Sequence, residues 1–104
     1  MPHIQIELPR EALADFCRRW MITEFALFGS VLRDDFGPES DIDVLVTYAP
    51  DAEWSLLDHV AMEDDLEAIL GRDVDILTRR GVEEGRNAIR RHEILVTAMP
   101  VALT

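Results

Sequence analysis

The sequence is poor in the residues that build disulfide scaffolds and membrane spans. Cys17 is the only cysteine among 104 residues, so no disulfide can form within the chain and a reducing cytoplasm is the expected location. Apolar neighbours at helical spacing make Cys17 a core thiol rather than a nucleophile. No stretch is apolar over the length of a membrane span, and the N-terminus lacks the basic start and apolar run of a signal peptide. We therefore expect no membrane contact.

Basic residues are also scarce. Lys and Arg total 10 against 21 Asp and Glu, which gives a formal net charge of −11. So acidic a chain repels nucleic acid, and we expect no direct nucleic-acid binding. The acidity suits metal binding or a basic protein partner, and it is equally consistent with a solvated acidic surface.

The length leaves room for one domain, which we place at residues 1–104. A hydrophobic fraction of 48% is enough for a buried core, so disorder is not expected. There is no space for a second domain that recognises a large substrate. Such a substrate has to be recognised by a surface patch or by another subunit.

Periodicity and turn residues predict an α/β (α+β) fold, with a small mixed β-sheet flanked by helices. The predicted helices span residues 9–21, 30 to about 36, 53–70 and 87–95, with Ser30 capping the second and Gly71 ending the third. The predicted strands span residues 24–28, 41–47 and 73–77, and residues 96–103 are expected to form an edge strand. Residues 79–86 are expected to form a loop or a single turn.

Two aspartates stand at positions i and i+2 of a predicted strand. Asp41 and Asp43 begin the run DIDVLVT, so both side chains project from the same face. Two carboxylates at this separation repel each other, and a core-facing pair without a cation would be strongly destabilising. The pair therefore marks either a cation site or a wet strand end.

A glycine and a serine precede this pair at a predicted strand-to-helix turn. Gly29 allows close backbone approach, where a Cβ would collide. Ser30 offers a hydroxyl, and the backbone N–H groups and helix N-terminus beside it favour a phosphate. A Gly-Ser pair alone is weak support. It gains meaning from the DxD strand that follows.

A third carboxylate, Asp75, lies in the predicted strand DVDIL, where Val74 and Ile76 face the opposite way. If this strand neighbours the 41–47 strand, Asp75 joins the same acidic cluster. Three carboxylates suit two Mg²⁺ ions, which prefer oxygen ligands and can activate a hydroxyl and steady a leaving pyrophosphate. Asp73 shares the face of Asp75 and competes for this role, but it stands at the start of the strand.

The segment GSVLRDDFGPESDID resembles the GSx10DxD signature of the DNA polymerase β-like nucleotidyltransferase superfamily. The spacing between Gly29-Ser30 and the DxD pair matches, apolar strands flank both motifs, and the later GRDVDIL resembles the strand of the third carboxylate. Over roughly residues 9–103 the chain is similar to the minimal nucleotidyltransferases, or MNT-domain proteins. The resemblance implies a polymerase β-like nucleotidyltransferase fold.

The resemblance also implies roles for the motif residues. Asp41 and Asp43 would hold two Mg²⁺ ions. Asp75 would complete one metal site and help the attacking hydroxyl to lose its proton. The residues implied in binding the triphosphate of ATP are Gly29, Ser30 and Arg33, the last at the GSxxR position. For Arg33, a surface pair with an acidic neighbour is an equal alternative.

MNT-domain proteins commonly pair with a HEPN-domain protein that resembles an RNase toxin, in type VII toxin–antitoxin pairs. The resemblance implies an antitoxin of the MntA type that forms a hetero-oligomer with the toxin and transfers AMP from ATP to a toxin tyrosine. The C-terminal segment RNAIRRHEILVTAMPVAL resembles the family's closing helix and strand. It departs from the family by lacking the Asn-Pro-aromatic opening and the final tyrosine of many members.

Other interpretations remain open at this point. The chain could neutralise a toxin by binding without catalysis, or it could modify a small molecule, although it is short for an acceptor pocket. A calcium loop is a poor fit, because DIDVLVTYAPDAE lacks the required glycine and the further spaced ligands. His3, His59 and His92 lack metal-ligand spacing and are expected at the surface.

Overall fold

A four-stranded mixed sheet forms the centre of the molecule. The computed structural model describes residues 6–34 and 36–103. The strands β1 (Ile22–Phe28), β2 (Ile42–Tyr48), β3 (Val74–Thr78) and β4 (Met99–Pro100) lie in the order β3-β2-β1-β4. The β2–β3 pair is parallel, and β1 runs antiparallel to both β2 and β4. The predicted mixed sheet is therefore confirmed.

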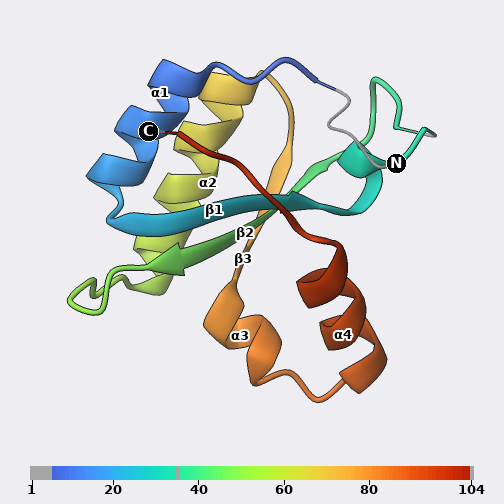
Figure 1. Cartoon of the computed structure of the whole chain (residues 1–104). Helices are drawn as coiled ribbons and strands as arrows, with labels where there is room; N and C mark the ends of the chain where they lie inside the picture. Colours follow the sequence, from blue (N-terminus) through green and yellow to red (C-terminus); the bar gives the residue numbers. More distant parts are fainter. Residues whose placement is uncertain (1–5, 35, 104) are drawn as a thin grey trace.

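Helices cover both faces of this sheet (Figure 1). Helices α1 (Arg10–Arg19) and α2 (Leu56–Leu70) pack on one face, over the larger of two hydrophobic clusters. The short α3 (Arg79–Glu83) and α4 (Ala88–Thr97) lie on the other face, where a smaller apolar cluster forms. Within the described residues, no helix combines the length and the apolar character needed to cross a membrane.

Alternation along β2 separates the two faces. Ile42, Val44 and Val46 are fully buried in the core beneath α1 and α2. Leu45 instead joins the smaller cluster, where Ile94 of α4 packs. Because side chains alternate along a strand, the odd-numbered residues of β2 all project toward α3 and α4. This alternation sets the face on which the aspartates lie.

Helix α2 begins and ends with specific caps. The Ser55 hydroxyl accepts a hydrogen bond from the Asp58 N–H, and the Asp58 carboxylate accepts one from the Ser55 N–H. Gly71 ends the helix in the left-handed conformation, with φ 69°, as predicted. The predicted start at residue 53 is wrong, because this capping box fixes the first helical residue as Leu56.

The turn after β1 differs from the prediction. The structure has one four-residue 3-10 helix, η1 (Gly29–Leu32), in place of a helix from residue 30 to about 36. Ser30 lies inside η1 and does not cap it; the capping position belongs to Phe28, which is extended. Arg33 already has extended backbone angles, and so the helix cannot continue through it.

The C-terminal prediction is also wrong in part. Asn87 caps α4 through a hydrogen bond from the Arg90 N–H, and the helix continues to Thr97 because Ile94 is buried against the sheet. The expected edge strand over residues 96–103 shrinks to β4, which pairs with β1. Residues 79–86, expected as a loop or single turn, contain the short α3.

The single cysteine is only partly buried and packs at the margin of the core. Cys17 packs against the cluster beneath α1 and α2, and burial raises the pKa of its thiol to about 11. A thiol with so high a pKa carries little thiolate at neutral pH, as is typical of a structural cysteine. The distance from His59 Nε2 to Glu63 Oε2 is 3.7 Å. His92 is exposed. His3 lies outside the described residues.

The packing of α2 leads to a stability prediction. Leu66 is fully buried between α2 and the sheet. Leu66→Ala should lower the free energy of unfolding by about 2–5 kcal/mol, because it removes buried apolar area and leaves a cavity. Urea denaturation followed by circular dichroism measures the change. The exposed Ile89 provides the matched control. Ile89→Ala should change stability by less than about 0.5 kcal/mol, and equal losses in the two variants would contradict the assigned core.

Candidate functional site

The motif residues meet at one level of the sheet. Gly29 follows the last residue of β1, and Phe28 is the register partner of Asp43 in β2. Asp43 is in turn the register partner of Asp75 in the parallel strand β3. The strands that carry Asp43 and Asp75 are therefore neighbours, as the predicted acidic cluster requires. The glycine turn and two carboxylates lie side by side across three strands.

Gly29 lies directly against Asp43. Its φ is +75°, a conformation that side chains other than glycine rarely adopt. A Cβ built on Gly29 would collide with the Asp43 carboxylate oxygen Oδ2 and lie 3.3 Å from Cγ. The backbone angle therefore favours glycine at this position, and a Cβ there would force the Asp43 carboxylate to move. The Gly29 turn therefore forms the wall of the site, meaning the surface that the Asp43 carboxylate contacts.

Ser30 connects the turn to the start of β2. Its hydroxyl donates a hydrogen bond of 3.3 Å to the main-chain oxygen of Asp41. The hydroxyl is thus held beside the main chain of Asp41, and its predicted role in phosphate binding stays a prediction. Because η1 has only four residues, the partial positive charge expected from a longer helix at this turn is small.

The environment of Asp43 disfavours its ionised carboxylate. Asp43 is half-buried, whereas the side chains of Asp41 and Asp75 are exposed. Burial raises the pKa of Asp43, and the negative charges of Asp75 and then Asp41 raise it further. Arg33 and Arg90 act in the opposite direction. The three predicted aspartates therefore interact electrostatically, and Asp75 rather than Asp73 is the β3 residue that acts on Asp43.

The donor set suits a hard cation, although it is not preassembled. Within residues 6–34 and 36–103, no three His, Cys, Asp or Glu side chains converge into a ready metal-binding group. The half-buried Asp43 carries an unfavourable charge beside two other carboxylates, which a divalent cation would compensate. Carboxylate oxygens are the ligands that Mg²⁺ prefers. Asp41 and Asp75 are exposed on either side of Asp43, where such an ion would be accessible to them.

Two arginines act on the site, and only one of them was predicted. Arg33 follows η1 and is exposed, and its charge lowers the pKa of Asp43, while its predicted contact with the triphosphate stays a prediction. Arg90 comes from α4, 47 positions after Asp43 in the sequence, and was missed. No local motif points to it. The available signal in the sequence is the cluster of arginines in residues 79–91, a segment predicted as a loop or single turn followed by a helix.

Helix α2 holds the strand that carries Asp75. The Ile76 N–H donates to Glu63 Oε2 at 3.0 Å, and the Val74 N–H donates to Glu67 Oε2 at 3.2 Å. These two residues flank Asp75, whose own position pairs with β2. The outer edge of β3 is thus satisfied by carboxylates instead of another strand. These hydrogen bonds help to hold the β3 main chain in place on both sides of Asp75, beside its register partner Asp43.

The Gly29 contact gives a direct test of the site. Gly29→Ala should lower stability by roughly 1–3 kcal/mol through backbone strain, and it should displace the Asp43 carboxylate. Thermal unfolding measures the first effect, and the Mg²⁺ dependence of the melting temperature measures the second. Gly37→Ala is the control, because nothing lies within 4 Å of a Cβ at Gly37. If both variants behave like the wild type, Gly29 does not form the wall of the site.

The raised pKa of Asp43 predicts a pH-dependent effect on stability. The ionised carboxylate costs folding free energy above its raised pKa, and this cost disappears below the ordinary value of 3.8, where the group is protonated in both states. Asp43→Asn should therefore raise the melting temperature at pH 7 without divalent cations. The gain should shrink as the pH falls and vanish near pH ~3. The exposed Asp64→Asn should show no such trend. A destabilised Asp43→Asn at pH 7 would mean that Arg33 and Arg90 outweigh the burial.

Comparison with known proteins agrees with this geometry. A nucleotidyltransferase domain model matches residues 9–96. The protein adenylyltransferase MntA of Thermococcus cleftensis is 34% identical over 67 residues, which are 64% of this chain and 66% of that protein. The match thus spans slightly less than two thirds of the relative's length.

Solved structures show the same fold. A structure described as a minimal nucleotidyltransferase has 35% identity and a TM-score of 0.67, with 88% of both chains covered. A toxin–antitoxin crystal structure with AMP-PNP has 18% identity and a TM-score of 0.68, with 89% of this chain and 72% of that chain covered. The predicted fold and family are confirmed. This chain belongs to the nucleotidyltransferase domain family and has the minimal nucleotidyltransferase fold.

Proposed function

We propose that this chain is a magnesium-dependent protein adenylyltransferase that acts as an antitoxin. It transfers AMP from ATP to a tyrosine hydroxyl of a HEPN-domain RNase toxin and so neutralises the toxin. The observation that carries the proposal is the alignment of Gly29, Asp43 and Asp75 at one level of three adjacent strands. A phosphate-binding turn and a set of carboxylates side by side are what phosphoryl transfer requires.

The relatives support the choice of reaction and partner. The Thermococcus relative is named for protein adenylyltransferase activity. Crystal structures of the same fold include an MntA–HepT toxin–antitoxin complex and one toxin–antitoxin structure with AMP-PNP. This chain retains the glycine turn and all three carboxylates, which a protein that acts only by binding does not need.

Each residue of the site has a role in the proposed reaction. Gly29 and Ser30 would receive the triphosphate, and Arg33 would offset its negative charge. Asp41, Asp43 and Asp75 would hold Mg²⁺, which stabilises the charge on the phosphates and lowers the pKa of an attacking hydroxyl. Asp75, on the outer strand, would also take part in removing that proton.

The transfer itself is a displacement at phosphorus. The tyrosine oxygen forms a bond to the α-phosphorus of ATP while the bond between that phosphorus and the bridging oxygen to the β-phosphate breaks. Pyrophosphate leaves with the bonding electrons, and the hydroxyl proton passes to a carboxylate or to solvent. The product is an AMP-tyrosine phosphodiester on the partner. Catalysis of this kind depends on positioning and on stabilising charge.

Mass spectrometry of the two chains tests the proposal. We expect the HEPN-domain partner to gain mass in AMP units after incubation with this chain, ATP and Mg²⁺. The double variant Asp41→Asn with Asp43→Asn should reduce the transfer by at least about 10³-fold, because both metal-holding carboxylates are lost. Transfer from α-labelled ATP gives the rate.

A matched control separates charge from chemistry. Asp51→Asn with Asp64→Asn changes the net charge equally at two exposed positions outside the site, and it should leave the rate unchanged. Wild-type rates in the Asp41/Asp43 variant would contradict the metal assignment. A partner that is bound and inhibited but never modified would support an antitoxin that acts by contact alone.

A further inference from the structure

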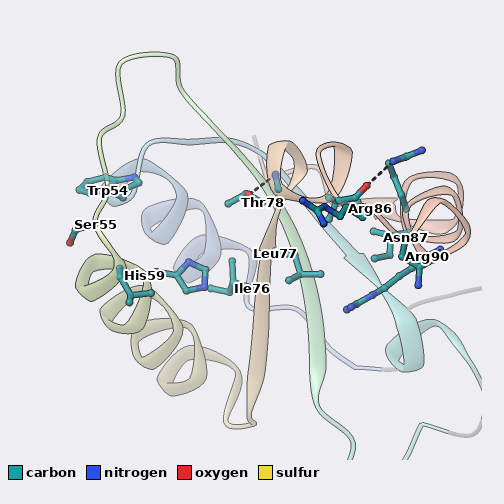
Figure 2. A pocket seen from close by; sticks show the side chains of 15 residues that line it. Trp54, Ser55, His59, Ile76, Leu77, Thr78, Arg86, Asn87 and Arg90 are labelled. Carbon is teal, nitrogen blue, oxygen red and sulfur yellow. Dashed lines mark hydrogen bonds between the residues drawn. The ribbon is translucent and has the colours of Figure 1, made fainter.

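A hollow of about 770 Å³ lies beside the site, outside the motif residues. It is bounded by the start of α2, by β3, and by α3 and α4 (Figure 2). Its walls are apolar where Leu77, Val82 and Ile94 line it, and Arg86 and Arg90 add positive charge. The size is that of a typical ligand-binding cavity. None of the predicted site residues lines it.

The order of strands places this hollow opposite the nucleotide turn. Gly29 and Ser30 follow β1, the aspartates lie on β2 and β3, and the hollow opens along β3. Leu77 comes two residues after Asp75, so it faces the same way about 7 Å further along the strand. The hollow therefore lies across the two aspartate strands from the Gly29–Ser30 turn. An acceptor bound in the hollow would reach the aspartates from the β3 side, whereas a nucleotide on the Gly29–Ser30 turn would reach them from the β1 side.

The charge of the hollow differs from that of the rest of the molecule. Arg86, Arg90 and Arg91 all line it, which is three of the 10 basic residues in a chain with a net charge of −11. The Arg90 side chain extends from α4 toward the sheet (Figure 2), and its charge acts on Asp43. A ligand with acidic groups is therefore attracted to this face and repelled by most others.

Exposed apolar side chains border the hollow. Leu56, which lines it, is 80% exposed, and Leu57 beside it is 81% exposed. Val60 is 49% exposed and lies one turn further along α2 on the same side as Leu56. These two leucines bury little of their surface within the chain, and apolar surface next to charged residues is typical of a protein interface.

We propose that this hollow, with the exposed start of α2, is the docking surface for the acceptor protein. The occupant is a segment that carries apolar and acidic side chains and delivers its hydroxyl group to the Asp75 side of the site. Leu56 and the hollow's walls receive the apolar part, and the three arginines bind the acidic part. The inference rests on the proposed adenylyl transfer, and it adds which surface selects the partner.

Steady-state kinetics with the HEPN-domain partner as acceptor test the proposal. Leu56→Ser and Arg86→Glu, both exposed positions outside the nucleotide site, should each raise the KM for the acceptor by about tenfold or more. The affinity for Mg-ATP, measured by calorimetry, should stay at the wild-type value. The acceptor KM of the wild type should also rise with salt, because charged groups contribute to the contact.

Matched variants outside the hollow provide the control. Ile89→Ser and Arg80→Glu change exposed side chains of the same kinds, 80% and 87% accessible, that do not line the hollow. Both should keep the wild-type KM for the acceptor. The proposal is overturned if Leu56→Ser and Arg86→Glu leave the acceptor KM unchanged. It is also overturned if they weaken Mg-ATP binding, since the hollow would then belong to the nucleotide.

Direct binding separates this inference from the proposed reaction. If the wild type binds the partner but transfers no AMP to it, the proposed function fails. The docking surface is then judged by affinity alone, and a tenfold loss in the two hollow variants would still support it. If transfer occurs and the hollow variants bind the partner as the wild type does, the proposed function stands and the docking surface is wrong.

Discussion

The position of the half-buried Asp43 carboxylate is the constraint on which the site depends. Ile42 and Val44 have to be buried beneath α1 and α2, so the residue between them must face the opposite side. There it meets the Gly29 turn, which leaves no room for a Cβ, and the register partner Asp75. The core therefore places a carboxylate where its charge is unfavourable, and a cation or a phosphate-bound cation would relieve that cost.

The two halves of the site differ in how they are built. The motif half comes from strand ends, whose positions are fixed by main-chain pairing across β1, β2 and β3. The half that faces the proposed acceptor comes from α3, α4 and the start of α2, which pack through a small cluster around Ile94. Strand pairing preserves geometry when surface residues change, whereas helix surfaces accept many side chains. This division suits an enzyme whose chemistry is fixed and whose partner is specific.

Much of the motif half could be predicted from the sequence, because period-two alternation and fixed spacing carry the information. The neighbouring positions of Asp43 and Asp75 follow from two β-branched strands in one small sheet. Arg90 and the hollow could not be predicted, since they depend on how α4 packs across the sheet. Ser30 was expected to cap a helix, but the chain becomes extended at Arg33 and the helix ends after one turn. The extension of α4 to Thr97 was missed because its apolar residues also fit a strand.

The carboxylates that bind the outer edge of β3 have a consequence for how this protein can associate. An open strand edge is a template for a further strand from another chain. Glu63 and Glu67 already accept the outward N–H groups of Ile76 and Val74, so sheet extension at β3 would first have to displace them. At the opposite edge, β4 offers only two residues. The β3 edge is thus protected by side chains, and a partner that meets this edge would have to recognise side chains instead of backbone.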